Sequence, residues 1–182
     1  YPLGELTEDE KRFYTWTLQS HIDLAKAVWL DYCECKMIDT IAREPLWRHL
    51  INYRCGTGHS VSFVGNVHEG PHALNSRNTT RMRPGMVVTD EPGVYETDLV
   101  GIRIENELVC IHKADNQYGT FLGFEPLTFV PIATSPILPG VLDKDELAWL
   151  NDYHRQVFVK LAPHLNAEER VWLAEKCASI GC

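Results

Sequence analysis

Apolar side chains recur with helical spacing near the start of the chain. Their broad face predicts a long helix over residues 8–29. Thr7 and Glu10 have the spacing of a capping box and mark where that helix begins. The apolar positions of this face are Phe13, Tyr14, Leu18, Ile22, Leu24, Ala25, Val28 and Trp29.

A second amphipathic pattern follows between residues 37 and 51. Met37, Ile38, Ile41 and Ala42 predict a second helix. Pro45 indicates a break or a fresh first turn, after which apolar residues continue to position 51. From 55 to about 84, Gly, Ser, Asn, His and Arg dominate, which predicts loops and short strands.

The second half of the chain begins with strand-like patterns and ends with helical ones. Residues 86–89 form a short β-type run, 91–93 give a turn signal, and 101–111 alternate as a half-buried strand does. Residues 121–132 predict further strand and turn. Asp143 with Glu146 and Asn166 with Glu169 each cap a helix. We expect one α+β domain over 1–182, with a helical C-terminal extension from about residue 143.

Composition excludes some classes of function. The 182 residues are 45% hydrophobic and 23% charged, and the net charge of −8 argues against a nucleic-acid partner. No apolar run approaches the roughly 20 residues of a membrane span. No basic and apolar leader opens the sequence. The six cysteines form no C-x-x-C pair, so we expect reduced thiols and a cytoplasmic location.

Three polar segments are candidates for chemistry, although each alone is a weak signal. They are residues 56–71, which contain His59 and His68, residues 89–93 and residues 101–106. Glu91 and Glu105 flank a predicted hairpin, so adjacent strands could bring both carboxylates together. Carboxylates that close repel unless a cation or a shared proton lies between them. One His with several carboxylates suits Mn²⁺, Co²⁺ or Zn²⁺.

Taken together, these segments resemble the Xaa-Pro aminopeptidase branch of the pita-bread metallopeptidases. The strings are G-T-G-H, N-V-H-E-G-P, T-D-E-P-G-x-Y, G-I-R-I-E-N and F-E-P-L-T, in that order. The flanks L-T-E-D-E-K, I-A-R-E-P-L-W and W-L-N-D-Y-H fit the same family. Several motifs in register are a specific signal. The resemblance implies the pita-bread catalytic fold and release of the N-terminal residue from Xaa-Pro peptides.

The resemblance also implies roles for individual residues. The family holds two divalent ions, usually Mn²⁺, with Co²⁺ and Zn²⁺ as alternatives. His59, Glu91 and Glu105 match metal ligands, and Glu91 would also help to deprotonate the attacking water. His68 matches a histidine that contacts the substrate carbonyl and stabilises the tetrahedral intermediate.

Three further residues match positions around this site. Tyr95 and Arg103 would support it through polar contacts. Cys55 stands where many relatives have His, and Ser60 and Ser62 stand where glycines are usual. Cys55 is therefore either a thiol that contacts metal or substrate or a buried structural thiol.

The family pattern places two further Asp ligands before Tyr1. We therefore expect a fold that is incomplete at its N-terminal side, with the chain alone binding metal poorly and inactive as a peptidase. Two alternatives stay open for the parent protein, a prolidase and a non-catalytic pita-bread module that binds peptides or proteins. The family also implies a homodimer, with contacts from the aromatic C-terminal segment that contains Trp149 and Trp172.

Overall fold

A computed structural model describes residues 1–181 of the chain. Internal contacts divide it into two compact units. One comprises Tyr1–Thr15 and the chain from Phe129 onward, and the other comprises Trp16–Thr128. The expected single domain, with a helical extension from about residue 143, stays a prediction.

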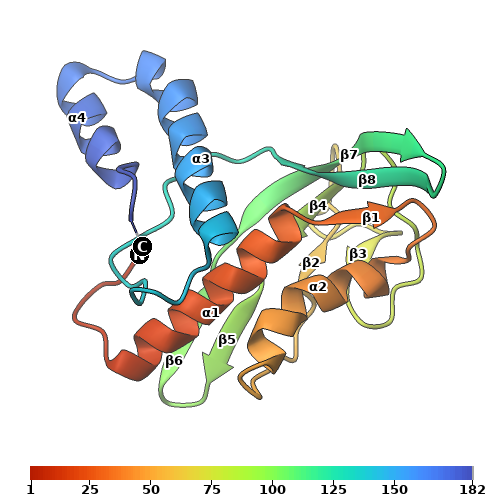
Figure 1. The fold of residues 1–182 in the computed structure, drawn as a ribbon, viewed down its shortest axis with the longest axis horizontal. Coiled ribbons are helices and arrows are strands. Elements are labelled where there is room, and N and C mark those ends of the chain that lie inside the picture. The colour runs from red at the N-terminus through yellow and green to blue at the C-terminus, as the bar shows by residue number, and fades with distance from the viewer. Residues whose placement is uncertain (182) are drawn as a thin grey trace. The chain divides into compact units, whose positions relative to one another are not determined.

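A four-stranded antiparallel sheet forms the centre of the Trp16–Thr128 unit (Figure 1). Its order is β1-β8-β7-β4. The strands are β1 (Val28–Leu30), β4 (Val87–Asp90), β7 (Asn106–Asn116) and β8 (Gly119–Pro126). The expected strand over 101–111 is wrong as one element, because Ile104 and Glu105 separate β7 from the preceding strand. Glu105 therefore lies between the two strands, directly before β7.

Two short hairpins complete the β structure of this unit. In the first, β2 (Gly58–His59) pairs with β3 (Ala73–Leu74). In the second, β5 (Gly93–Glu96) pairs with β6 (Val100–Arg103) in the register Gly93↔Arg103. The second hairpin confirms that Glu91 and Glu105 flank a turn of two adjacent strands.

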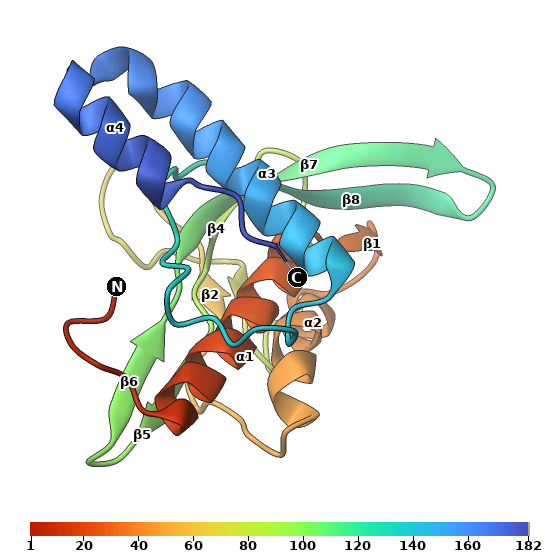
Figure 2. The ribbon, with the colours of Figure 1, turned by 60° about the vertical axis from the view of Figure 1, so that its left-hand side comes forward.

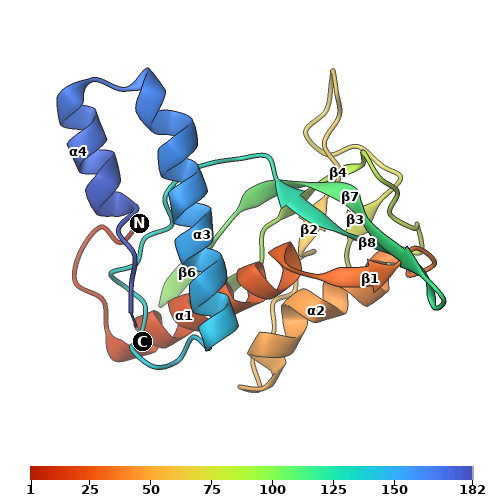
Figure 3. The same cartoon turned by 45° about the horizontal axis from the view of Figure 1, so that its top comes forward.

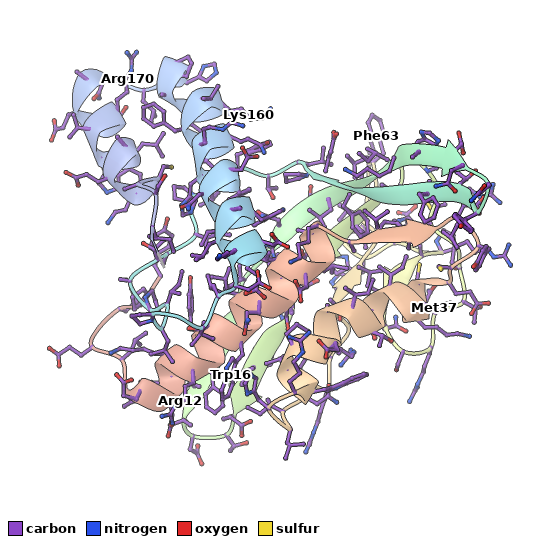
Figure 4. The ribbon with its side chains drawn as sticks, in the orientation of Figure 1. Arg12, Trp16, Met37, Phe63, Lys160 and Arg170 are labelled. Carbon is purple, nitrogen blue, oxygen red and sulfur yellow. The ribbon has the colours of Figure 1, made fainter. Side chains whose placement is uncertain are left out.

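Helix α2 (Cys35–Trp47) and the second part of α1 (Glu8–Ala25) belong to the same unit. The ring of Trp16 on α1, labelled in Figure 4, stacks on His49 after α2 with centroids 3.9 Å apart. Leu18 and Ile22 of α1 and Leu46 of α2 have no exposed surface, so both helices contribute to the core. Burying each such side chain contributes about 2 kcal/mol.

The helix ends differ from the sequence expectation at two places. α1 ends at Ala25 rather than Trp29, because Val28–Leu30 pairs with β8 as strand β1. Pro45 lies inside α2 and does not break it. Pro45 is buried in the last turn, so only one backbone hydrogen bond is given up while its ring packs in the core.

The other unit contains α3 (Lys144–Leu161), the 3-10 turn η1 (Ala162–His164) and α4 (Ala167–Lys176). Figures 1 and 2 show α3 and α4 side by side. Complete capping boxes at Asp143 and Asn166 confirm the predicted helix starts. Trp149 stacks on buried Tyr153 with centroids 5.3 Å apart. None of the helices in the described part of the chain is long and apolar enough to span a membrane.

Candidate active site

The loop before His59 is fixed by polar side chains of α2. Arg43, only 7% exposed, donates to the carbonyl oxygens of Tyr53 and Cys55, both at 2.8 Å. Asp39 accepts from the Thr57 hydroxyl at 2.5 Å and from Arg43 Nε at 2.8 Å. Buried charge-assisted bonds of this kind are geometrically demanding, so they restrain the backbone that enters β2.

Strand β2 lies directly against β4. The backbone N–H of His59 donates to the Thr89 hydroxyl at 2.9 Å, and the N–H of Glu91 donates to the Thr57 carbonyl at 2.8 Å. Gly58 permits this approach, because a Cβ built there would lie 1.7 Å from the Thr89 carbonyl oxygen. The glycine of the G-T-G-H motif is therefore a packing requirement of the site.

We expect Gly58→Ala to destabilise the protein by about 3 kcal/mol and to separate His59 from Glu91, since the clash is with backbone that cannot rotate away. Urea unfolding would measure the loss. Gly56→Ala is the matched control, because its Cβ would meet no atom closer than 3.4 Å. Equal unfolding free energies for the two variants would show that the close approach of β2 and β4 is not required.

His59 and Glu91 are in direct contact. His59 Nε2 lies 3.1 Å from Glu91 Oε1. His59 Nδ1 lies 3.1 Å from the carbonyl oxygen of Ser60, which can only accept, so the ring proton belongs on Nδ1. The Thr89 hydroxyl donates to Glu91 Oε1 at 2.8 Å. This arrangement leaves Nε2 facing the carboxylate of Glu91, a residue that is 9% exposed.

Arg103 connects the two glutamates. Its Nη1 lies 3.2 Å from Glu91 Oε2 and 4.0 Å from Glu105 Oε2, while its Nε donates to the Tyr95 hydroxyl at 2.8 Å. Burial, followed by the charge of Glu91, raises the pKa of Glu105. The prediction that Glu91 and Glu105 come together is confirmed, and the remaining repulsion between them is what a cation would relieve.

His68 completes the group from the long loop between β2 and β3. Its ring stacks on that of His59, with centroids 3.7 Å apart and planes 19° apart. Figure 3 shows this loop extending away from the strands. The loop carries Phe63, whose side chain is fully exposed (Figure 4). A cavity of about 340 Å³ opens at this point. Its lining residues are Cys55, Gly56, Gly58, His59, His68, Ala73, Asn75, Glu91 and Arg103.

The remaining predicted site residues lie around this cavity. Cys55 is an exposed free thiol that lines it, so the interpretation as a buried structural thiol is wrong. Tyr95 does not line this cavity; it lines a neighbouring one together with Cys55 and Arg54. Cys33, Cys35, Cys110 and Cys177 are also free thiols, and Cys182 lies outside the described residues.

The donors present fit part of a divalent metal site. His59 offers an imidazole nitrogen in the ligand tautomer, fixed by a backbone carbonyl as is usual for metal-bound histidines. Glu91 and Glu105 offer carboxylate oxygens, and this N/O set suits Mn²⁺, Co²⁺ or Zn²⁺. Within residues 1–181, however, no three His, Cys, Asp or Glu side chains converge closely enough to hold an ion by themselves.

Sequence reasoning missed a buried polar chain behind the glutamates. His21 Nδ1 lies 3.2 Å from Asp90 Oδ2, and both side chains are fully buried. His21 Nε2 lies 3.2 Å from the Asn106 amide, which accepts from Thr128 at 2.9 Å. Asp90 directly precedes Glu91, and Asn106 directly follows Glu105. A histidine inside the apolar stripe of the first helix was the signal that could have revealed this chain.

Comparison with known proteins gives a family match over most of the sequence. Residues 1–112 match metallopeptidase family M24, and residues 120–180 match the C-terminal region of peptidase M24. Aminopeptidase P1 of Lotus japonicus is 39% identical over 98% of this chain. Aminopeptidase P2 of Arabidopsis thaliana is 43% identical over 93% of it. The chain spans 28% and 25% of the lengths of these two relatives.

Solved structures of related peptidases also match this chain. An X-prolyl aminopeptidase from Caenorhabditis elegans, described as a cytosolic enzyme with a di-nuclear active site, matches with a TM-score of 0.90. It is 36% identical, and the match covers 97% of this chain and 30% of that protein. A prolidase from Pyrococcus furiosus matches less well, with a TM-score of 0.60 and 26% identity over 71% of this chain and 35% of that protein.

Proposed function

Because the chain belongs to metallopeptidase family M24, we propose that the protein is a metal-dependent aminopeptidase. It releases the N-terminal residue from peptides that have proline at the second position. The observation that carries this proposal is the contact between His59 Nε2 and Glu91 Oε1 at 3.1 Å, in a cavity that His68 and Arg103 also line. Pita-bread relatives with aminopeptidase activity support it.

His59, Glu91 and Glu105 would hold the metal centre, which we propose contains two divalent ions. Mn²⁺ is the proposed ion, with Co²⁺ and Zn²⁺ as alternatives, since imidazole and carboxylate donors suit all three. Ions in such a centre supply Lewis acidity and a nucleophile near neutral pH. Because no three donor side chains within residues 1–181 converge closely enough to hold an ion by themselves, we propose that this part of the protein alone binds metal weakly and is inactive.

Glu91 is the proposed acceptor of the proton from the attacking water. Its two oxygens have different neighbours: Oε1 accepts from Thr89 and faces His59, whereas Oε2 faces Arg103. A hydrogen bond from Thr89 to Oε1 and the ion pair of Oε2 with Arg103 hold the carboxylate in one orientation, which general-base catalysis requires. Glu91 can therefore take a proton without losing its position.

His68 is the proposed partner of the scissile carbonyl oxygen. Stacking on His59 at 3.7 Å fixes its ring next to the metal-ligand position while the residue stays exposed to the cavity. A histidine held in this way can donate a hydrogen bond to the oxygen as negative charge develops. Arg103, oriented by the Tyr95 hydroxyl at 2.8 Å, contacts both glutamates and offsets part of the repulsion between them. Cys55 forms part of the substrate-facing wall.

The aminopeptidase assignment is preferred to a prolidase, which would cleave only dipeptides. Relatives at 39–43% identity are aminopeptidases P, whereas the prolidase structure is 26% identical. The cytosolic location described for the Caenorhabditis elegans enzyme supports a cytoplasmic location here. We also propose a homodimer for the whole protein.

Metal removal tests the proposal. We expect the protein, expressed from its complete gene, to lose release of alanine from Ala-Pro-Ala after dialysis against a chelator. Addition of Mn²⁺ should restore it, because the ions supply the nucleophile. His59→Ala should resist restoration, whereas His164→Ala, an exposed residue of η1, should be restored as the wild type is. A protein that binds the peptide equally with and without metal, and never cleaves it, would instead be a peptide-binding module.

A further inference from the structure

A second cavity of about 680 Å³ lies within the Trp16–Thr128 unit, next to the proposed active site. Its walls come from the end of α2, the segment that leads into β2, and the segment that follows β3. The lining residues are Arg43, Trp47, Asn52, Tyr53, Arg54, Cys55, Gly56, Asn75, Ser76 and Arg77. None of them is a Glu or Asp, although the chain as a whole carries a net charge of −8.

The arginines of this cavity differ in how their charge is balanced. Arg43 is buried and its charge is neutralised by Asp39, 2.8 Å away. Arg54 and Arg77 are exposed, and within residues 1–181 neither guanidinium has an ion pair or a hydrogen bond. Glu96 lines a neighbouring cavity with Arg54 but forms no ion pair with it in that same range. The cavity therefore presents two unbalanced positive charges.

This arginine cavity borders the active-site cavity. Cys55, Gly56 and Asn75 line both of them. Asn75 already orients its own loop by accepting from the backbone N–H groups of Arg77 and Asn78 at 3.0 and 3.1 Å. The arginine cavity therefore lies within reach of a peptide whose reacting bond is beside Glu91 and whose C-terminal part passes Cys55.

We propose that the arginine cavity is an anion subsite that binds a carboxylate of the peptide on the C-terminal side of the proline. This inference rests on the proposed function, because it names which substrates the same site prefers. Arg54 and Arg77 attract the carboxylate, and the planar guanidinium geometry matches that group in a bidentate way. The cationic N-terminal amine of a peptide would be repelled from this cavity, so the peptide enters it with its other end.

Trp47 and Asn52 give the subsite a defined wall. The Trp47 indole N–H donates to Asn52 Oδ1 at 3.1 Å, and Arg43 Nη1 donates to the same oxygen at 3.1 Å. These bonds hold the indole beside the cavity, where its face can cover a backbone segment of the peptide. The two free guanidiniums remain available for the carboxylate.

Three peptides of equal length test this subsite. They are Ala-Pro-Ala-Ala amide, the same peptide with a free C-terminal carboxylate, and Ala-Pro-Ala-Glu amide. With metal-loaded protein expressed from its complete gene, we expect KM for a carboxylate peptide to be about fivefold lower than for the neutral amide. High salt should reduce this ratio because the charges are exposed. The second and third peptides distinguish a terminal carboxylate from a side-chain carboxylate. A lower KM for either of them than for the neutral amide supports the subsite.

Variants assign the preference to its residues. The relevant ratio is KM for the neutral amide divided by KM for a carboxylate peptide. Arg54→Ala and Arg77→Ala should each reduce this ratio, and the double variant should bring it to about one. Arg54→Lys should keep part of the preference. Arg83→Ala, an exposed arginine outside the cavity, is the matched control and should keep the full ratio. Equal KM values for all three peptides, with normal cleavage, would overturn the subsite and leave the proposed function standing. No cleavage of any peptide would overturn both.

Discussion

Glu91→Gln is expected to lower kcat for hydrolysis of Xaa-Pro peptides by about a thousandfold. The amide keeps the size of the carboxylate but removes its charge and its ability to take a proton. Glu91 Oε1 contacts His59 Nε2 at 3.1 Å and Oε2 contacts Arg103 at 3.2 Å, so the substitution affects the proposed metal ligation and the proton acceptor together. Steady-state kinetics on Ala-Pro-Ala with saturating Mn²⁺ would measure the loss.

The control for this prediction is Glu125→Gln on β8. Glu125 is exposed and lies outside the active-site cavity, so its variant should keep wild-type kcat. Both variants should show the same thermal unfolding midpoint within a few degrees, which separates a loss of chemistry from a loss of fold. Retention of more than a tenth of the wild-type kcat by Glu91→Gln would remove Glu91 from the reaction.

The sequence was sufficient to predict most helices and the convergence of His59, Glu91 and Glu105, because both depend on local signals. Capping residues fixed the starts of α3 and α4. The motifs placed His59, Glu91 and Glu105 on segments that the structure brings to one place. Their proximity follows from the hairpin of β5 and β6 and from the pairing of Asp90 with Asn106.

The features that escaped prediction depend on contacts between distant segments. Val28–Leu30 continues the apolar pattern of α1 but pairs with β8, almost a hundred positions later in the chain, and tertiary pairing outweighs the local preference. Arg54 and Arg77 share a cavity only because β2 pairs with β3, and no spacing rule links them. The exposure of Cys55 likewise follows from how its loop is held by Arg43.

His21→Ala is expected to destabilise the protein by about 3–5 kcal/mol, because it leaves the carboxylate of Asp90 buried without its partner. His21 Nδ1 and Asp90 Oδ2 are 3.2 Å apart and neither side chain is exposed. Burial raises the pKa of Asp90, and the contact with His21 opposes that rise. Removal of the imidazole therefore withdraws the main group that offsets the cost of burying this carboxylate. Urea unfolding at pH 7 would measure the difference in free energy.

The surface of the protein carries a second His–Asp pair that serves as the control for His21 and Asp90. His112 and Asp115 lie 2.9 Å apart, but their side chains are 50% and 66% exposed. Water and salt screen such a pair, so His112→Ala should leave stability close to that of the wild type. Adding Asp90→Asn to His21→Ala should recover part of the loss, because the buried group then carries no charge. If His21→Ala and His112→Ala lowered the free energy of unfolding equally, burial would not determine how much a His–Asp pair contributes to stability. The buried chain behind Glu91 and Glu105 would then have no stabilising role distinct from a surface contact.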